Sequence, residues 1–189
     1  MSNETADRIG AVARELLLAE GTPAVSMRRV AAAVGVTPMA IYRHYPSREA
    51  MLAAVADTAF AELAATWRRP GGGAHAELHG ALDVLLDLAV DQPHLYRFLF
   101  TERRADARTF PDDMRAGRSP TLNLLAGIVR DGIREGALRD DDAWDVAFTI
   151  AAHIQGLILL VQGGRVGPVD TLRAYCHASL ERLIHGLAP

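Results

Sequence analysis

Residues 25–52 read VSMRRVAAAVGVTPMAIYRHYPSREAML, and this stretch predicts a helix-turn-helix. Ser26 can cap a first helix over MRRVAAAV, which Gly35 ends, because glycine is favoured just beyond a helix C-terminus. Thr37 supplies a second capping hydroxyl and Pro38 a first helical residue, so a second short helix begins there. Two short helices joined by a tight turn are the layout in which the second helix can enter the major groove of DNA.

The outward face of the second helix carries residues suited to nucleic acid. Val30, Ala31 and Ile41 are expected to face the core, whereas the residues expected outside are Thr37, Pro38, Met39, Tyr42, Arg43 and His44, flanked by Arg28 and Arg48. Ser26 and Ser47 cap the two flanking helices, whose free backbone N–H groups and positive dipole ends suit phosphate oxygens. The pattern therefore predicts phosphate contacts on both sides of a groove-reading helix.

The charge distribution supports this interpretation. The chain of 189 residues carries a net charge of -3, yet the stretch from Gly21 to Arg48 has four arginines and neither Asp nor Glu. A small basic patch on an acidic body is the electrostatic footprint of a nucleic-acid-binding face. The alternative is a small helical bundle in which Tyr42 and Tyr45 are core aromatics and the arginines form a solvated face, although solvated faces usually mix charge signs.

Further spaced residues extend the pattern along the chain. They are an amphipathic helix over residues 9–17, Gly21, Val25-Ser26-Met27-Arg28, Val30-Ala31, Gly35-Val36, and Ile41-Tyr42-Arg43-His44-Tyr45 followed by Ser47-Arg48-Glu49. On these residues, the segment 9–55 resembles the DNA-binding domain of the TetR family of transcriptional repressors. The resemblance implies that the DNA backbone or grooves are contacted by Ser26, Arg28, Tyr42, His44 and Arg48, and that base edges are approached by Thr37, Pro38 and Met39. The family more often has Lys at the position of Arg48, and the two cations differ in hydrogen-bonding geometry.

The rest of the chain predicts an all-α protein of about nine helices. After a helix from Arg48 to Trp67, which RRPGGG stops, further helices are expected over residues 76–90, 93–102, 120–135, 142–162 and 168–186. The polar segment 103–118 is expected to be a disordered loop rather than a mobile flap over a pocket. The predicted domains are a helix-turn-helix domain over 1–47 and a larger helical ligand-binding and dimerisation domain over 48–189.

The C-terminal helices predict an association surface. The helix over 142–162 is apolar on more than one face and needs partners beyond one neighbouring helix, which a second subunit would supply. The last helix is the second candidate, so we expect a two-fold four-helix interface built from these two. The family resemblance likewise implies a homodimer whose larger domain binds a small molecule.

Candidate residues for an effector pocket lie on several helices. They are Trp67, Leu95, Phe98, Leu99, Asn123, Trp144, Phe148 and His153. An apolar or aromatic stripe at helical spacing more often fills a core, and His153 is more often a hydrogen-bonded core or interface histidine than a ligand contact.

Enzyme and metal chemistry find little support in the sequence. His75 and His79 could share one helical face, but no third ligand is apparent and the pair is expected to be solvated. The single Cys176 excludes an internal disulfide and a cysteine zinc cluster, and is expected to be a small buried residue. We expect no catalytic residues, no metal site, no cofactor and no membrane span, and a cytoplasmic location.

The function these patterns predict is a homodimeric TetR-like regulator, most simply a repressor, that binds a palindromic double-stranded DNA operator and is released by an unknown small-molecule effector. Two alternatives remain open. One is a helical small-molecule-binding protein or enzyme that kept the scaffold, and the other is a regulator of the same fold controlled by a protein partner.

Overall fold

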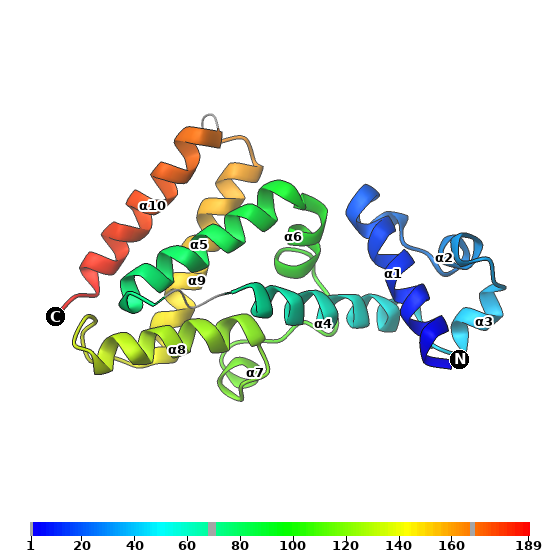
Figure 1. The fold of residues 1–189 in the computed structure, drawn as a ribbon, viewed down its shortest axis with the longest axis horizontal. Coiled ribbons are helices and arrows are strands. Elements are labelled where there is room, and N and C mark those ends of the chain that lie inside the picture. Colours follow the sequence, from blue (N-terminus) through cyan, green and yellow to red (C-terminus); the bar gives the residue numbers. More distant parts are fainter. Residues whose placement is uncertain (1, 68–70, 167–168) are drawn as a thin grey trace. The chain divides into compact units, whose positions relative to one another are not determined.

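The computed structural model describes residues 2–67, 71–166 and 169–189, and every regular element in those ranges is helical (Figure 1). The elements are α1 (Ser2–Glu20), the 3₁₀ turn η1 (Thr22–Ala24), α2 (Met27–Val34), α3 (Pro38–Tyr42), α4 (Arg48–Thr66), α5 (Gly73–Asp91), α6 (Pro93–Phe100), α7 (Asp112–Arg115), α8 (Pro120–Arg134), α9 (Ala143–Gln162) and α10 (Val169–Gly186). The predicted all-α class is confirmed, and the predicted helices over 76–90, 93–102, 120–135 and 142–162 begin and end within three residues of the observed ones.

The chain divides into two compact units. The first comprises residues 1–62 and 91–107, and the second comprises residues 63–90 and 108–189. Helix α4 contributes to both, because its last turn belongs to the second unit, and α6 belongs to the first unit with α1, against which it packs. These units differ from the predicted division at residue 48, which sequence periodicity placed where a new helix starts.

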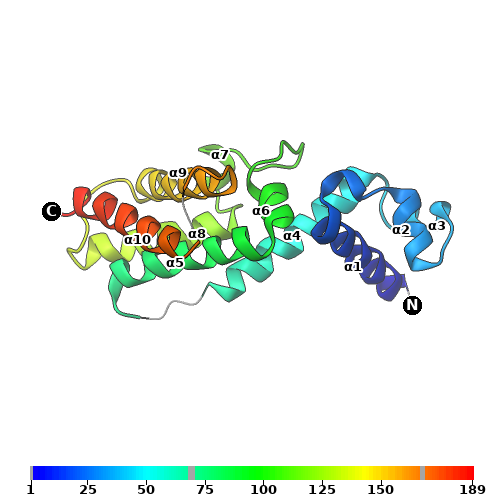
Figure 2. The ribbon, with the colours of Figure 1, turned by 90° about the horizontal axis from the view of Figure 1, so that it is seen from above.

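Local chemistry explains why α2 and α3 form. The Ser26 hydroxyl accepts a hydrogen bond from the Arg29 backbone N–H at 3.2 Å, and the Thr37 hydroxyl accepts one from that of Ala40 at 3.3 Å. Between them, Gly35 has a φ of 79°, a left-handed conformation that glycine adopts without steric cost, and its N–H bonds back to the last turn of α2. Figures 1 and 2 show α2 and α3 as neighbouring short helices beyond α1.

The second unit is a bundle built from α5, α8, α9 and α10. Helix α9 packs against both α8 and α10, and side chains of α10 also bond to α5. Apolar residues at helical spacing are buried on each of these helices, as amphipathic helices require. They include Leu78, Leu82, Leu85, Leu125, Val129, Ile150, Ile154, Ile158, Leu172, Cys176 and Leu180.

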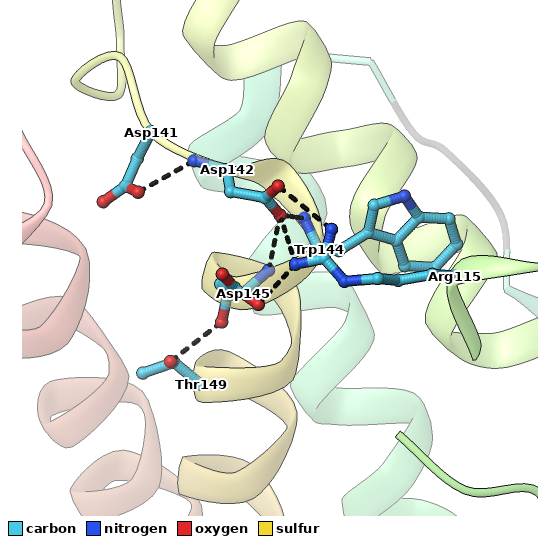
Figure 3. Close-up of polar contacts among 6 residues, drawn as sticks. All are labelled: Arg115, Asp141, Asp142, Trp144, Asp145 and Thr149. Atoms are coloured by element: carbon cyan, nitrogen blue, oxygen red, sulfur yellow. Dashed lines mark hydrogen bonds and ion pairs between the residues drawn. The ribbon is translucent and has the colours of Figure 1, made fainter. Parts of the chain in front are cut away.

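The segment predicted as a disordered loop contains the short helix α7 and is tied to α9. Figure 3 shows the Arg115 side chain reaching the start of α9, where its two terminal nitrogens donate to the Asp142 carboxylate at 3.1 Å and one of them to Asp145 at 2.7 Å. Asp142 also caps α9 by accepting the backbone N–H groups of Trp144 and Asp145. These hydrogen bonds, that from Arg115 foremost, lower the pKa of Asp142.

A ring contact holds the same segment a turn further along α9. Phe110 stacks on Phe148, with ring centroids 4.2 Å apart. The interpretation of 103–118 as a disordered loop is therefore wrong for the part that carries Phe110 and Arg115. An aromatic pair and a charged pair fix this part against residues that lie far away in the sequence.

Helix α9 is long and apolar enough to cross a membrane by length and composition alone. In the most apolar stretch of this helix, 33% of the residues are buried. Core helices of soluble proteins also satisfy these criteria of length and composition. Its polar residues Asp145, Thr149, His153 and Gln155 are the reason the sequence predicts no membrane span.

Close packing between α5 and α8 yields a stability prediction. A Cβ on Gly132 would lie 2.7 Å from the Ala74 Cβ and 2.9 Å from the Leu138 Cδ1, and all three residues are buried. We expect Gly132→Ala to lower the free energy of unfolding by about 1–3 kcal/mol, because the added methyl overpacks this contact. Gly127→Ala on the same helix meets open space and is expected to raise it by about 0.5–1 kcal/mol through helix propensity. Chemical denaturation measures both, and equal effects would contradict the packing argument.

Candidate nucleic-acid interface

Helix α3 presents an exposed face on a buried anchor. Ile41 is fully buried, whereas Met39 is 69% and Tyr42 49% exposed. Thr37, Pro38 and Arg43 are exposed too, and His44 is half-buried. The alternative in which Tyr42 is a core aromatic is therefore wrong, although Tyr45 does turn inward, its hydroxyl donating to the Ala6 carbonyl at 3.3 Å.

The four arginines of the basic stretch have different surroundings. Arg29 forms a two-pronged ion pair with Glu20 of α1, and this hydrogen bonding lowers the pKa of Glu20. Arg28 and Arg43 are exposed and form no ion pair with any described residue. The formal charge of +4 therefore overstates the charge available to phosphate, since Glu20 neutralises one arginine from just outside the stretch.

Arg48 lies at the start of α4 and bonds inward. Its Nε donates to the Val25 carbonyl at 2.6 Å and one terminal nitrogen donates to the Thr22 carbonyl at 2.7 Å. The other terminal nitrogen lies 3.9 Å from the Glu49 carboxylate. The sequence predicts that Arg48 contacts a DNA phosphate. In the structure, its guanidinium group primarily joins α4 to the turn before α2.

The predicted helix caps are in place at both flanking helices. The Ser47 hydroxyl accepts the Ala50 backbone N–H at 3.1 Å, as Ser26 accepts that of Arg29. The first turns of α2 and α4 therefore keep further backbone N–H groups without intrahelical partners, and such groups attract anions. The arrangement is chemically suited to gripping a phosphate backbone around a short exposed helix.

The predicted effector residues do not gather in one compact unit. Leu95, Phe98 and Leu99 are buried in α6 of the first unit, where the Arg104 guanidinium lies 4.8 Å from the Phe98 ring centroid. The residues that belong to the second unit are Trp67, Asn123, Trp144, Phe148 and His153.

Within the second unit these residues have distinct roles. The Phe148 side chain is 39% exposed and stacks on Phe110, and His153 bonds to the Ser179 hydroxyl at 3.3 Å, in the manner of a core or interface histidine. The Trp67 Nε1 and the Asn123 Oδ1 are buried without a hydrogen-bond partner among the described residues. Buried polar atoms of this kind are costly unless something else satisfies them.

Two family models match this chain. The first, bacterial regulatory proteins of the tetR family, matches residues 9–55. The second, the tetracyclin repressor-like C-terminal domain, matches residues 78–187, which is more than half of the chain. No curated protein matches the sequence significantly.

Solved structures share the fold over nearly the whole chain. The regulator FadR from Bacillus subtilis, solved with stearoyl-CoA, aligns with a TM-score of 0.75 and 19% identity over 95% of this chain and 98% of its own. A TetR-family regulator from Pectobacterium atrosepticum aligns with a TM-score of 0.75 and 20% identity over 99% and 95%. A regulator from Saccharomonospora viridis, solved with choline, aligns with a TM-score of 0.70 and 24% identity over 95% and 96%.

The inward bonds of Arg48 predict a structural role that a DNA assay alone would not reveal. We expect Arg48→Ala to lower the free energy of unfolding by about 1–3 kcal/mol, because hydrogen bonds from a charged donor contribute about that much. Arg43→Ala removes the same charge from an exposed position and is expected to change it by less than about 0.5 kcal/mol. Urea denaturation of both variants checks this, and matching midpoints would refute the assignment.

Proposed function

Because this chain belongs to the TetR family of bacterial regulatory proteins, we propose that it is a homodimeric repressor that binds a palindromic DNA operator and is released by a small, largely apolar effector. The observation that carries the proposal is the exposed face of α3 beside two unpaired arginines. An anchored short helix whose outer side chains are free is what groove reading requires.

The residues proposed to contact base edges lie on and just before α3. Met39 offers an apolar tip for a thymine methyl group, and Thr37 and Tyr42 offer hydroxyl groups that donate or accept hydrogen bonds at base edges or phosphates. Arg28 and Arg43 supply the phosphate contacts that position the helix. The first turns of α2 and α4, which Ser26 and Ser47 cap, add backbone N–H groups that can donate to the same phosphates.

The dimer surface lies on α9 and α10. Large apolar side chains are exposed on both helices: Phe148, Leu159 and Leu160 on α9 and Tyr175 on α10. Exposed apolar side chains on neighbouring helices mark association sites, and a symmetric pair of such helices gives a four-helix interface. A second copy also supplies the second recognition helix that a palindromic operator needs.

The effector site is assigned to the second unit. Its buried aliphatic side chains provide an apolar lining, and the unpartnered Trp67 Nε1 and Asn123 Oδ1 provide two polar atoms for a ligand to satisfy. The similar regulators bind stearoyl-CoA in one case and choline in another, so the fold accepts chemically different ligands. Helix α4 contributes to both units, so a ligand-dependent tilt of this helix would alter the spacing of the two recognition helices.

The two unpaired arginines predict how DNA binding depends on salt. Each neutralised phosphate contributes about 0.9 to the slope of log K against log salt, so Arg28→Ala and Arg43→Ala should each reduce the slope of a dimer by about 1.8. Arg29→Ala is the matched control, since Glu20 already pairs with that arginine, and its slope should stay close to that of the wild type. Fluorescence anisotropy with an operator selected from random DNA measures all three slopes.

Two results would count against the DNA-binding proposal. One is a selection experiment that enriches no sequence over bulk competitor DNA, which would favour a ligand carrier that kept the scaffold. The other is an equal change of slope in all three arginine variants, which would indicate nonspecific attraction rather than defined phosphate contacts.

The exposed apolar side chains predict the oligomeric state. Leu159→Arg places a charge in the proposed interface of α9, and we expect it to yield monomers in sedimentation velocity at concentrations where the wild type is dimeric. Val90→Arg changes an exposed apolar side chain on α5 in the same way and should leave the dimer intact. Far-ultraviolet circular dichroism checks that both variants fold. A dimeric Leu159→Arg protein would place the interface elsewhere.

A further inference from the structure

A cluster of nitrogen and oxygen donors lies where α5 meets α10. His75 and His79 are one turn apart on α5, and His177 and Glu181 are one turn apart on α10. Residues four apart share one face of a helix, so each helix offers a pair of donors to the other. The two helices run antiparallel here, because His75 meets Glu181 while Asp83 meets His177 and Arg173.

Three of these side chains converge on a small volume. The His75 Nε2 lies 2.6 Å and the His79 Nε2 3.0 Å from the same Glu181 oxygen, and one donor atom from each residue lies within 4.8 Å of the others. Donors on a tetrahedral ion with bonds of about 2.0–2.1 Å lie about 3.3 Å apart, so small side-chain adjustments suffice to enclose one. The sequence analysis did not identify this third donor, because Glu181 lies more than a hundred positions further along the chain than His75.

A fourth residue, His177, contacts His79 on the side of the ring away from Glu181. The His79 Nδ1 lies 2.6 Å from the His177 Nδ1, and the His177 Nε2 lies 2.8 Å from an Asp83 oxygen. Arg173 in turn donates to the same Asp83 oxygen at 2.6 Å. His79 is only 18% exposed, so its ring is held in this chain of contacts and is not the solvated side chain expected from sequence.

The contacts behind the three donors fit a metal-bound histidine. With a metal ion at the His79 Nε2, the His79 Nδ1 can donate to the His177 Nδ1, and the His177 Nε2 can donate to Asp83.

We propose that His75, His79 and Glu181 form a binding site for a divalent transition-metal ion of the zinc class, with His177 and Asp83 as its supporting shell. Two imidazole nitrogens and one carboxylate suit Zn²⁺ rather than Mg²⁺ or Ca²⁺, which prefer oxygen ligands. Three protein ligands leave a fourth position, which faces solvent because the His75 and Glu181 side chains are about half exposed.

The ion would join the start of α5 to the second half of α10, because His75 and His79 lie on α5 and Glu181 lies on α10. Its binding requires neither DNA nor a second subunit.

Zinc titration of the tag-free, full-length protein after chelator treatment tests the proposal. Competition with a chromogenic chelator is expected to give one Zn²⁺ per chain. His79→Ala and Glu181→Gln should each weaken binding by at least about 100-fold, and His177→Ala by about 10–100-fold, the usual effect of losing an orienting partner. His94→Ala, a histidine of the first unit, should bind zinc like the wild type.

Position and fold are checked separately. Diffraction at the zinc absorption edge is expected to place an anomalous peak among the three donors, and circular dichroism verifies that each variant folds. Glu181→Gln is nearly isosteric and half exposed, so it keeps the test informative even if a histidine variant is unstable. Wild-type affinity in His79→Ala or Glu181→Gln, several weak equivalents instead of one tight one, or a peak elsewhere would overturn the proposal.

Discussion

The burial of Ile41 is the constraint on which the proposed DNA-binding face depends. Helices α2 and α3 have eight and five residues, and isolated helices shorter than about 12–15 residues are marginal in water. They persist because Val30 and Ile41 are fully buried and because hydroxyl caps satisfy their first N–H groups. With Ile41 inward, helical geometry leaves Met39 and Tyr42 outward, so one buried side chain determines which residues form the face proposed to read DNA.

The charge that the arginines of residues 21–48 present to solvent depends on hydrogen-bond partners that a charge count over this stretch does not include. Glu20 lies just before the acid-free stretch and neutralises Arg29, and the backbone carbonyls of Thr22 and Val25 engage Arg48. The arginine at the start of α4 thus joins this helix to the turn before α2, while Arg28 and Arg43 form no ion pair with a described residue. Similar side chains in one short stretch therefore divide into structural and ligand-facing roles.

Sequence reasoning succeeded wherever the information was local. The caps at Ser26 and Thr37 and the turn at Gly35 depend on neighbouring residues only, so the helix-turn-helix could be located before its structure was known. It failed for pairings across long separations, such as Arg115 with Asp142, which orders a segment taken for a loop. The burial of Leu95, Phe98 and Leu99 could be predicted from apolar periodicity, but the helices against which they pack could not, because periodicity shows that a face is buried and not what buries it.

Helix α10 shows how one element serves several purposes at once. Leu172, Cys176 and Leu180 recur every four residues and are buried in the bundle, whereas Arg173, His177 and Glu181 follow them by one position and bond to α5. Tyr175 lies on a further, exposed face, the face proposed for the second subunit. An offset of one position rotates a side chain by about 100°, so the buried row, the row that bonds to α5 and Tyr175 point in three different directions. A cation bound between α5 and α10 would therefore restrain the same helix that is proposed to support the dimer, and it would do so without occupying the dimer surface.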